Sequence, residues 1–209
     1  SVSRGLGDVY KRQAMAGETN KLNEWANQLG GSNLNAEYDV IVSSGEQVTS
    51  GLLALHLNKI GINARSWMAW QIPFVTDSTY TKARITEIRA AELKASLDEK
   101  CVAVVPGFQG VTNNKRITTL GRGGSDTTAV ALAAALNAER CDIYTDVDGV
   151  YTTDPRIVAK ARKIDAVTYE EMLEMASQGA KVLQTRSVAL AMLYDCLLYT
   201  SDAADDVAS

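Results

Sequence analysis

The chain has 209 residues, of which 46% are hydrophobic and 22% are charged, and its formal net charge is −4. This length and composition fit one globular domain with a sizeable core, and the mild acidity offers no basic surface to nucleic acid or an anionic membrane. No stretch approaches the roughly 18 apolar residues of a membrane span, no secretory leader is visible, and the three cysteines show no metal-ligand spacing. We therefore expect a cytoplasmic protein whose partners include neither nucleic acid nor membrane.

Both ends of the chain lack a steady hydrophobic period. Residues 1–13 and 196–209 adjoin segments that begin and stop in mid-pattern. We interpret both as non-native tails and exclude them from the predicted fold. The remaining residues, 14–195, form one predicted domain without an internal repeat or an interdomain linker.

Helix-like and strand-like segments alternate along this domain. The hydrophobic spacing predicts a helix over 19–29, a buried strand over 38–43, a helix from Gly45-Glu46 to Lys59, a strand over 62–67, a loop or short strand over 71–82, a helix over 85–99 and a strand over 101–105. The only histidine, His56, falls in the second helix and is interpreted as a packed residue, which excludes a Ser/His/Asp site.

The second half continues the pattern. It predicts a hairpin tip over 110–116, an alanine-rich helix over 126–138, a strand over 141–145, and a helix that starts with a capping box at Thr168 and Glu171 and ends at Gly179. Strands rich in Val and Ile, separated by helices, predict an α/β fold with a mostly parallel sheet covered on both faces. Ligands of such sheets bind beyond the carboxyl ends of the strands, so the loops that begin at Ser43, Pro106 and Thr145 are candidate site loops.

The most informative motif is Thr-Thr-Leu-Gly-Arg-Gly-Gly-Ser-Asp at residues 118–126. Its glycines let the backbone turn sharply beside a ligand, and the helix that follows directs free N–H groups and a positive dipole end into the same space. Arg122 and Asp126 would let the loop hold an acidic group and steer charge. An ordinary turn with a helix cap is the alternative. The motif is neither a P-loop nor a dinucleotide-binding fingerprint.

Further loops carry side chains suited to the same ligand. Glu46 begins a predicted helix, and beside Arg122 it could bind an ammonium group while the arginine binds a carboxylate, as recognition of an amino acid requires. Residues 145–156 form a long polar segment suited to a nucleotide base and ribose, although Asp148-Gly149 by itself is an ordinary turn. Lys181 could meet phosphates, or could be a solvated charge at a helix end.

Together these motifs closely resemble the bacterial aspartate kinase (aspartokinase) family of the amino-acid kinase superfamily. The resemblance runs through residues 14–20, 44–47, 105–110, 118–126, 144–156 and 170–181, and covers nearly all of 14–194. It implies a three-layer αβα sandwich. It also implies phosphorylation of the L-aspartate side-chain carboxylate to 4-phospho-L-aspartate with ATP and Mg²⁺, the first step towards lysine, threonine and methionine.

The resemblance implies roles for matching residues. The implied catalytic residues are Asp126 and Arg122, and the implied substrate-binding residues are Thr19, Glu46, Arg122, Gly123, Gly124 and Ser125. The implied nucleotide-binding residues are Tyr144, Thr145, Asp146, Val150, Tyr151, Asp154, Pro155, Arg156 and Lys181. It assigns no side chain as a metal ligand.

The chain departs from the family pattern at both ends. The family begins with a strand and a Lys-Phe-Gly-Gly-Thr-Ser loop whose lysine grips the transferring phosphate, and no such segment precedes Ala14. Loss of this charge would cost on the order of 10³-fold in rate. We therefore expect a partial catalytic domain without its first strand and phosphate loop, with two alternatives: a module that binds nucleotide or aspartate without turnover, and an unstable truncation. The regulatory ACT domains, through which we expect the parent to form homo- or hetero-oligomers, are also absent from these residues.

Overall fold

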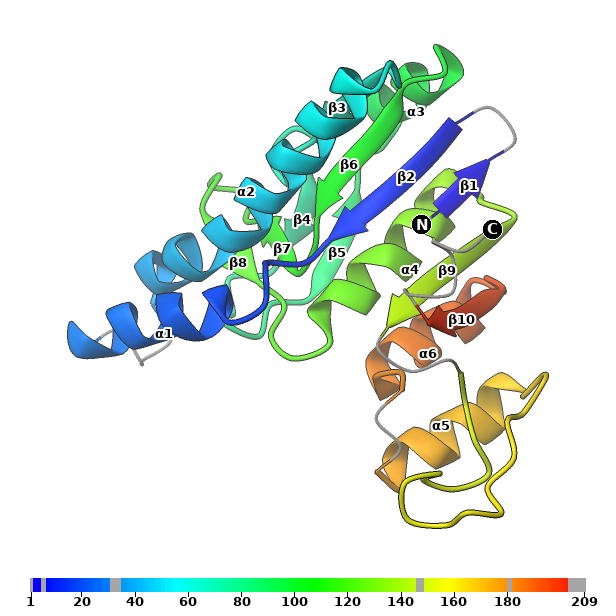
Figure 1. Cartoon of the computed structure of the whole chain (residues 1–209). Helices are drawn as coiled ribbons and strands as arrows, with labels where there is room; N and C mark the ends of the chain where they lie inside the picture. The colour runs from blue at the N-terminus through cyan, green and yellow to red at the C-terminus, as the bar shows by residue number, and fades with distance from the viewer. Residues whose placement is uncertain (1, 5–6, 31–34, 146–148, 180–181, 203–209) are drawn as a thin grey trace.

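A mostly parallel sheet of six strands forms the centre of the protein. The computed structural model describes residues 2–4, 7–30, 35–145, 149–179 and 182–202. The sheet has the order β10-β9-β1-β2-β6-β3 (Figure 1). Its strands are β1 (Val2–Arg4), β2 (Gly7–Arg12), β3 (Ala64–Ser66), β6 (Val102–Pro106), β9 (Arg140–Thr145) and β10 (Leu198–Asp202). β2 and β3 are parallel to β6, and β10 is parallel to β9, whereas β1 runs antiparallel to β2 and β9. The predicted parallel sheet is confirmed.

A second sheet, of four strands, has the order β5-β4-β7-β8. It comprises β4 (Phe74–Thr76), β5 (Ile85–Ile88), β7 (Gln109–Val111) and β8 (Ile117–Thr119). β7 and β8 are antiparallel, with Gln109 opposite Thr119, so the predicted hairpin tip is confirmed. This hairpin returns the chain to the glycine-rich loop, which leads directly into the next helix.

Helices cover both faces of the six-stranded sheet. They are α1 (Glu18–Gln28), α2 (Ala36–Lys59), α3 (Ala91–Asp98), α4 (Gly124–Leu136), α5 (Tyr169–Ser177) and α6 (Thr185–Leu193). α1 and α2 pack on each other in front of the sheet and α4 lies behind it, while α5 and the segment before it project below the sandwich (Figure 1). The α/β sandwich is thus confirmed. No helix of the described part of the chain is long and apolar enough to cross a bilayer.

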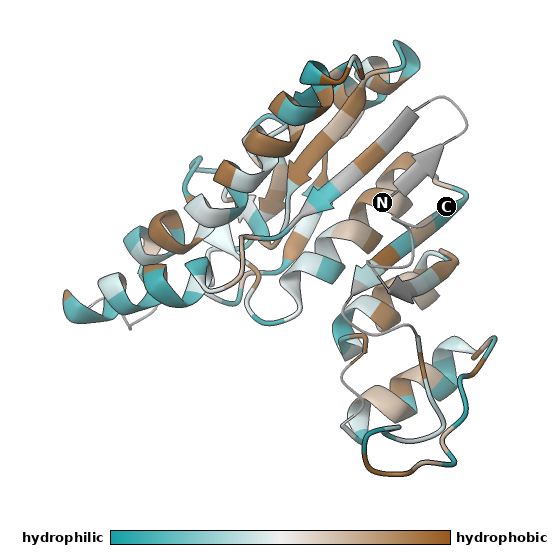
Figure 2. Ribbon diagram, in the orientation of Figure 1, coloured by the Kyte–Doolittle hydropathy of each residue, from teal (hydrophilic) through white to brown (hydrophobic). Residues whose placement is uncertain are grey.

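The core lies between α4 and the strands. Leu132 and Leu136 on α4 are fully buried, as are Phe74 on β4 and Leu93 on α3. The alanines of α4 have small side chains, which let the helix approach the sheet closely, and Figure 2 shows β6 as largely hydrophobic. Burial of this apolar surface is the main driving force for the fold.

The predicted strand over 38–43 is wrong, because these residues belong to α2. The Asn35 side chain caps the helix by accepting a hydrogen bond from the Glu37 N–H at 2.9 Å, and Glu37 and Asp39 carry negative charge in its first turn. The buried positions Asp39, Val42, Ser43 and Glu46 follow the helical period. The β-branched residues at 40–42 had suggested a strand, because such residues favour extended structure. Glu46 consequently lies in the middle of a helix, and His56, on the same helix, is exposed rather than packed.

The segment over 85–99 is helical only in its second part. Ile85–Ile88 form β5, which pairs antiparallel with β4, and the helix α3 begins at Ala91. The β-branched Ile85 and Thr86 suit a strand, and the pairing partner β4 that decides between the two states lies about ten residues upstream.

Parts of both excluded tails lie inside the sheet, so their exclusion from the fold is corrected. β2 pairs with β6 from Val9 opposite Ala103 to Arg12 opposite Pro106, and β10 pairs with β9 from Leu198 opposite Cys141 to Asp202 opposite Thr145. A strand therefore precedes Ala14, although it carries no Lys-Phe-Gly-Gly-Thr-Ser loop. The non-native origin of the two ends stays a prediction.

Candidate active site

A cavity of about 540 Å³ opens where α1, α2 and the loop between β8 and α4 meet. All of the predicted catalytic and substrate-binding residues line it: Thr19, Glu46, Arg122, Gly123, Gly124, Ser125 and Asp126. They come from three segments that are far apart in the sequence. Their convergence on one cavity is the arrangement expected for a ligand site of an α/β fold.

Glu46 brings a buried carboxylate to this cavity. Its side chain is 5% exposed, and its Oε2 has no hydrogen-bond partner among the described residues. Burial raises the pKa of Glu46 from 4.5 to about 7, against the opposing effects of its own backbone N–H, the Ala14 N–H and the charge of Lys11. An acceptor left without a partner in a cavity is suited to a cationic donor from a ligand.

The glycine-rich loop forms the opposite kind of surface, one that offers donors. Gly121 and Gly123 have φ values of 74° and 70°, which bulkier residues rarely adopt, and Gly123 starts α4 without a side-chain cap. The Ser125 Oγ is buried and also lacks a partner among the described residues. The free N–H groups and positive end of α4 therefore lie beside Arg122 and are available to an anion.

Asp126 adds a carboxylate on the first turn of α4. Its Oδ1 lies 3.6 Å from the Lys11 Nζ of β2, and the two side chains are 19% and 12% exposed. The sequence reasoning missed Lys11 because it excluded residues 1–13 from the fold. The Lys11 ammonium therefore forms an ion pair with Asp126 beside the cavity.

Several lining residues were not predicted. They include Asn23 and Tyr38, whose side chains meet when the Tyr38 Oη donates to the Asn23 Oδ1 at 2.8 Å, and Thr81, Phe108 and Thr119. Asn23 follows Thr19 by four residues and so lies on the same face of α1, which is a signal that the sequence did contain. Phe108 and Thr119 fall in segments already predicted to approach a ligand, at 106–110 and 118–126, whereas Thr81 carries no such signal because long-range packing brings it to the cavity.

The predicted nucleotide-binding residues that the structure describes do not line this cavity. Tyr144 is the exposed penultimate residue of β9, Val150 is buried, and Tyr151 forms a bridge with Lys163. Asp154 accepts hydrogen bonds from the backbone and guanidinium of Arg156, with Pro155 exposed between them. The structure describes only the backbone of Thr145, and Asp146 and Lys181 lie outside the described residues.

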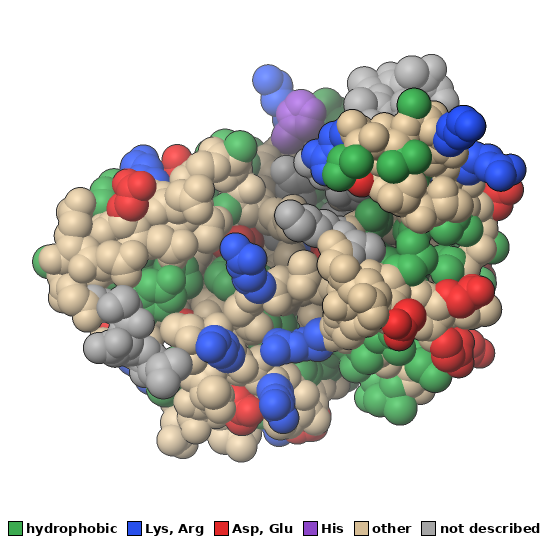
Figure 3. Space-filling view, turned by 90° about the horizontal axis from the view of Figure 1, so that it is seen from below, with side chains coloured by type: hydrophobic (Ala, Val, Ile, Leu, Met, Phe, Trp, Pro, Cys, Tyr) green, Lys and Arg blue, Asp and Glu red, His purple; other side chains and the backbone are tan. Residues whose placement is uncertain are grey.

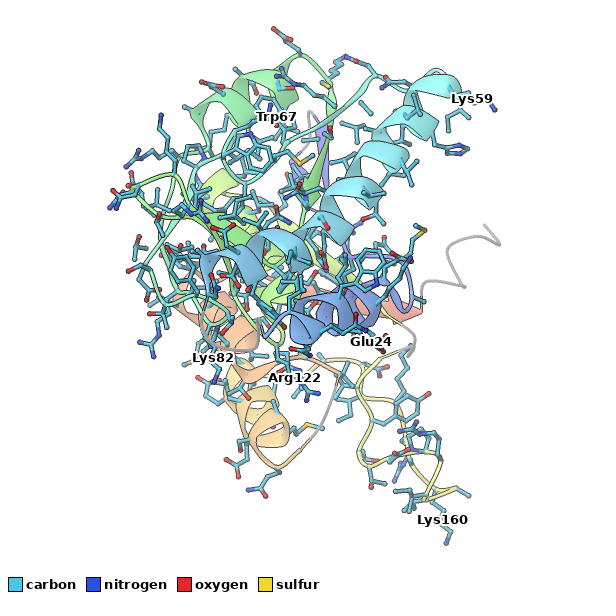
Figure 4. The ribbon with its side chains drawn as sticks, turned by 90° about the vertical axis from the view of Figure 1, so that its left-hand side faces the viewer. Glu24, Lys59, Trp67, Lys82, Arg122 and Lys160 are labelled. Carbon is cyan, nitrogen blue, oxygen red and sulfur yellow. The ribbon has the colours of Figure 1, made fainter. Side chains whose placement is uncertain are left out.

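The segment that follows β9 belongs to the projecting part of the molecule (Figure 1). In Figure 4, Arg122 lies at the edge of the sandwich that faces α5, and Lys160 lies at the far tip of the projecting segment. Seen from below, several Lys and Arg side chains gather near the middle of this side of the protein (Figure 3). A side that presents cations is suited to the phosphate groups of a ligand.

The described residues contain no cluster of three His, Cys, Asp or Glu side chains that would hold a metal by itself. Mg²⁺ usually binds one or two carboxylates together with phosphates and water. Asp126, as a cavity-lining carboxylate, fits that pattern.

Comparison with known proteins assigns the family. A profile described as the amino acid kinase family matches residues 3–198. Curated relatives include an aspartokinase of Pseudomonas aeruginosa, 58% identical over 92% of this chain and 47% of its own length, and an aspartate kinase of Pseudomonas putida, 57% identical over the same shares. The chain thus spans about half the length of these relatives.

Solved structures agree with this result. Aspartokinase III of E. coli, in complex with aspartate and ADP, superposes with a TM-score of 0.78 at 35% identity, covering 92% of this chain and 44% of that protein. Aspartate kinase from Synechocystis gives a TM-score of 0.81 at 43% identity, covering 93% of this chain and 32% of that protein. The chain belongs to the amino acid kinase family.

Proposed function

We propose that this chain forms the catalytic domain of an aspartate kinase, which transfers the γ-phosphoryl group of ATP to the side-chain carboxylate of L-aspartate. One observation carries the proposal: a single cavity is lined both by Glu46, with a buried oxygen that lacks a partner among the described residues, and by Arg122. The identity to aspartate kinases over 92% of the chain supports the choice of substrate.

Arg122 and Glu46 bind different groups of the substrate. Arg122 pairs with a carboxylate of aspartate, for which its planar guanidinium is suited, and Glu46 accepts hydrogen bonds from the ammonium group. The hydroxyl groups of Ser125 and Thr19 supply further polar contacts. Together these contacts orient the second carboxylate for reaction.

The nucleotide binds between the start of α4 and the segment from Tyr144 to Arg156, with Thr145, Asp146 and Lys181 among its contacts. Mg²⁺ neutralises charge on the phosphates when bound, and Asp126 would hold it. Alignment of the attacking carboxylate oxygen with the γ-phosphorus is the main task of the protein in phosphoryl transfer, and no covalent enzyme intermediate is required. Arg122 and Lys11 supply positive charge near the reacting groups.

The proposed function includes a metabolic use of the product and an oligomeric parent protein. The product, 4-phospho-L-aspartate, would enter the synthesis of lysine, threonine and methionine in the cytoplasm. The parent protein would assemble as an oligomer through regulatory domains beyond these residues.

Calorimetric titration tests the proposal directly. We expect L-aspartate and Mg-ATP each to bind one site, and succinate, which has the two carboxylates but no ammonium group, to bind at least tenfold more weakly than aspartate. Equal binding of succinate and aspartate would exclude the role of Glu46, and a folded protein that binds neither aspartate nor Mg-ATP would contradict the proposal.

A second candidate function is binding of aspartate and nucleotide without turnover. It is favoured by one observation, that the 209 residues contain no Lys-Phe-Gly-Gly-Thr-Ser sequence. An assay of aspartate-dependent ADP release separates the two functions, because only the kinase couples the two ligands.

A further inference from the structure

Asp39, which no sequence motif singled out, is a buried carboxylate behind residues that line the cavity. It lies in the first turn of α2, its exposed fraction is 0%, and it has no ion-pair partner among the described residues. Burial raises its pKa, while hydrogen bonds from Thr81 and Thr119 lower it. A carboxylate in such a place needs several donors to be stable.

Two separate segments provide these donors. The Thr81 N–H lies 3.1 and 3.0 Å from the Asp39 Oδ1 and Oδ2, the Thr119 N–H donates to Oδ2 at 2.8 Å, and the Thr119 hydroxyl donates to Oδ1 at 2.8 Å. The partners of the Asp39 carboxylate among the described residues are therefore all donors. In an asparagine the NH₂ group would replace an oxygen that accepts from these donors, so the negative charge would be lost and the Thr119 hydroxyl would have to reverse its role from donor to acceptor.

Both segments contact the glycine-rich loop. Thr119 lies in the same stretch of chain, separated from Gly121 by Leu120 alone, and its carbonyl accepts a hydrogen bond from the Ala83 N–H at 2.9 Å. The Thr81 carbonyl packs so closely on Gly121 that a Cβ at position 121 would lie 2.8 Å from it.

The Thr81 turn is held in an uncommon conformation. Thr81 has a φ of 67°, which a non-glycine residue adopts only when its surroundings determine it. The hydrogen bonds from its N–H to Asp39 provide that constraint. Thr81, Thr119, Gly121 and Arg122 all line the cavity, so Asp39 fixes the wall that carries the arginine.

We propose that Asp39 is a positioning residue for aspartate binding, which holds the Thr81 turn and the end of β8 so that Arg122 meets the substrate carboxylate. This inference rests on the proposed function. Asp39 acts from the α2 side of the cavity, whereas the predicted nucleotide residues that the structure describes lie on β9 and the segment after it and do not line the cavity. Its loss is therefore expected to affect the two ligands unequally.

The test is calorimetric titration of Asp39→Asn with L-aspartate and, separately, with Mg-ATP. We expect the Kd for aspartate to rise at least tenfold, because hydrogen bonds to a charged acceptor are lost, while the Kd for Mg-ATP changes less than twofold. Thr119→Val, which removes a donor but keeps the shape of the side chain, is expected to raise the Kd for aspartate by a smaller factor. It replaces Asp39→Asn as the test if the latter does not fold.

Asp77→Asn is the matched control. Asp77 also accepts two backbone hydrogen bonds, from Thr79 and Arg84 at 3.1 and 3.2 Å, in the turn next to Thr81, but it does not line the cavity. It should leave both affinities within twofold of the wild-type values.

Three results overturn the inference. They are unchanged aspartate affinity in Asp39→Asn and Thr119→Val, a parallel loss of both ligands, and an equal loss of aspartate affinity in Asp77→Asn. A wild-type protein that binds no aspartate would overturn the proposed function as well, so the two failures are distinguishable.

Discussion

Gly123 packs directly against Gln184, the residue that precedes α6, so that a Cβ at position 123 would lie 2.6 Å from the Gln184 Cβ. The same loop is held from a second side, because the Arg186 Nη1 donates to the Leu120 carbonyl at 3.0 Å. The start of α6 thus supports the loop that carries Arg122. The arrangement explains why a glycine is needed at position 123 for both its conformation and its lack of a side chain.

Gly123→Ala is expected to lower the free energy of unfolding by about 2 to 4 kcal/mol, since it combines a strained φ with a steric clash. Gly61→Ala is the matched control, because Gly61 has a φ of 86° but no atom within 4 Å of an added Cβ. It should cost about 1 kcal/mol. Urea unfolding of both variants measures the difference, and equal costs would show that contact with Gln184 is unimportant.

Arg122→Ala is expected to weaken aspartate binding by on the order of 100-fold, because a paired carboxylate would lose its guanidinium partner. Arg89→Ala is a suitable control, since Arg89 forms an exposed ion pair with Glu87 and does not line the cavity. Calorimetric titration measures the aspartate affinity of both variants. Wild-type affinity in Arg122→Ala would remove the arginine from the substrate site.

The raised pKa of Glu46 predicts how the stability of the protein depends on pH. Its pKa is about 7 in the folded protein and 4.5 ordinarily, so between these values the folded state binds a proton that the unfolded state has released. The free energy of unfolding should therefore fall as the pH rises from about 4.5 to about 7. Glu46→Gln should abolish this part of the dependence, which unfolding at a series of pH values measures. An identical pH dependence in the two proteins would disprove the assignment.

Binding should show the opposite trend, because the ammonium group of aspartate requires an ionised Glu46. The affinity of the wild-type protein for aspartate is expected to rise as the pH increases through about 7, and that of Glu46→Gln is expected to stay low. Calorimetric titrations of both proteins with aspartate at pH 6 and pH 8 are sufficient to compare their affinities.

The capping box of α5 predicts a purely structural effect. The Thr168 Oγ1 accepts a hydrogen bond from the Glu171 N–H at 3.2 Å, and the Glu171 Oε2 accepts one from the Thr168 N–H at 2.9 Å. Thr168→Ala should lower the free energy of unfolding by about 1 kcal/mol and leave aspartate affinity unchanged. A thermal unfolding experiment measures the loss of stability, and a separate calorimetric titration measures the aspartate affinity. A large loss of aspartate affinity would contradict the purely structural role of the capping box.

The sequence predicted elements correctly where one local signal determined the structure. The capping box at Thr168 set the start of α5, and the glycines after β8 predicted both the loop and the helix that follows. The strand over 38–43 failed because β-branched residues suit either state, and the Asn35 cap and the donors around Asp39 were needed to decide. The excluded ends failed for a related reason, since their pairing partners β6 and β9 are distant in sequence.

The sequence brought together residues that line one cavity, although it placed some of the surrounding elements wrongly, and the roles of these residues stay predictions. Thr19, Glu46 and the residues of 122–126 were assigned through motifs. A motif identifies the chemical groups of its residues, and this identification holds whether Glu46 starts a helix or lies within one. Thr81 and Asp39 were missed because their contribution arises from hydrogen bonds between segments about 40 residues apart, which no local pattern reveals.

The most direct test of the proposed kinase is an ADP-release assay with ATP, Mg²⁺ and L-aspartate. It should compare this chain with a version that carries a Lys-Phe-Gly-Gly-Thr-Ser strand and loop before Ala14, and with the Arg122→Ala variant of that version. We predict aspartate-dependent ADP release from the extended protein, much less from this chain, and almost none from the variant. An extended protein that is folded and binds Mg-ATP, yet releases no more ADP when aspartate is added, would contradict the assignment of these loops to an aspartate kinase.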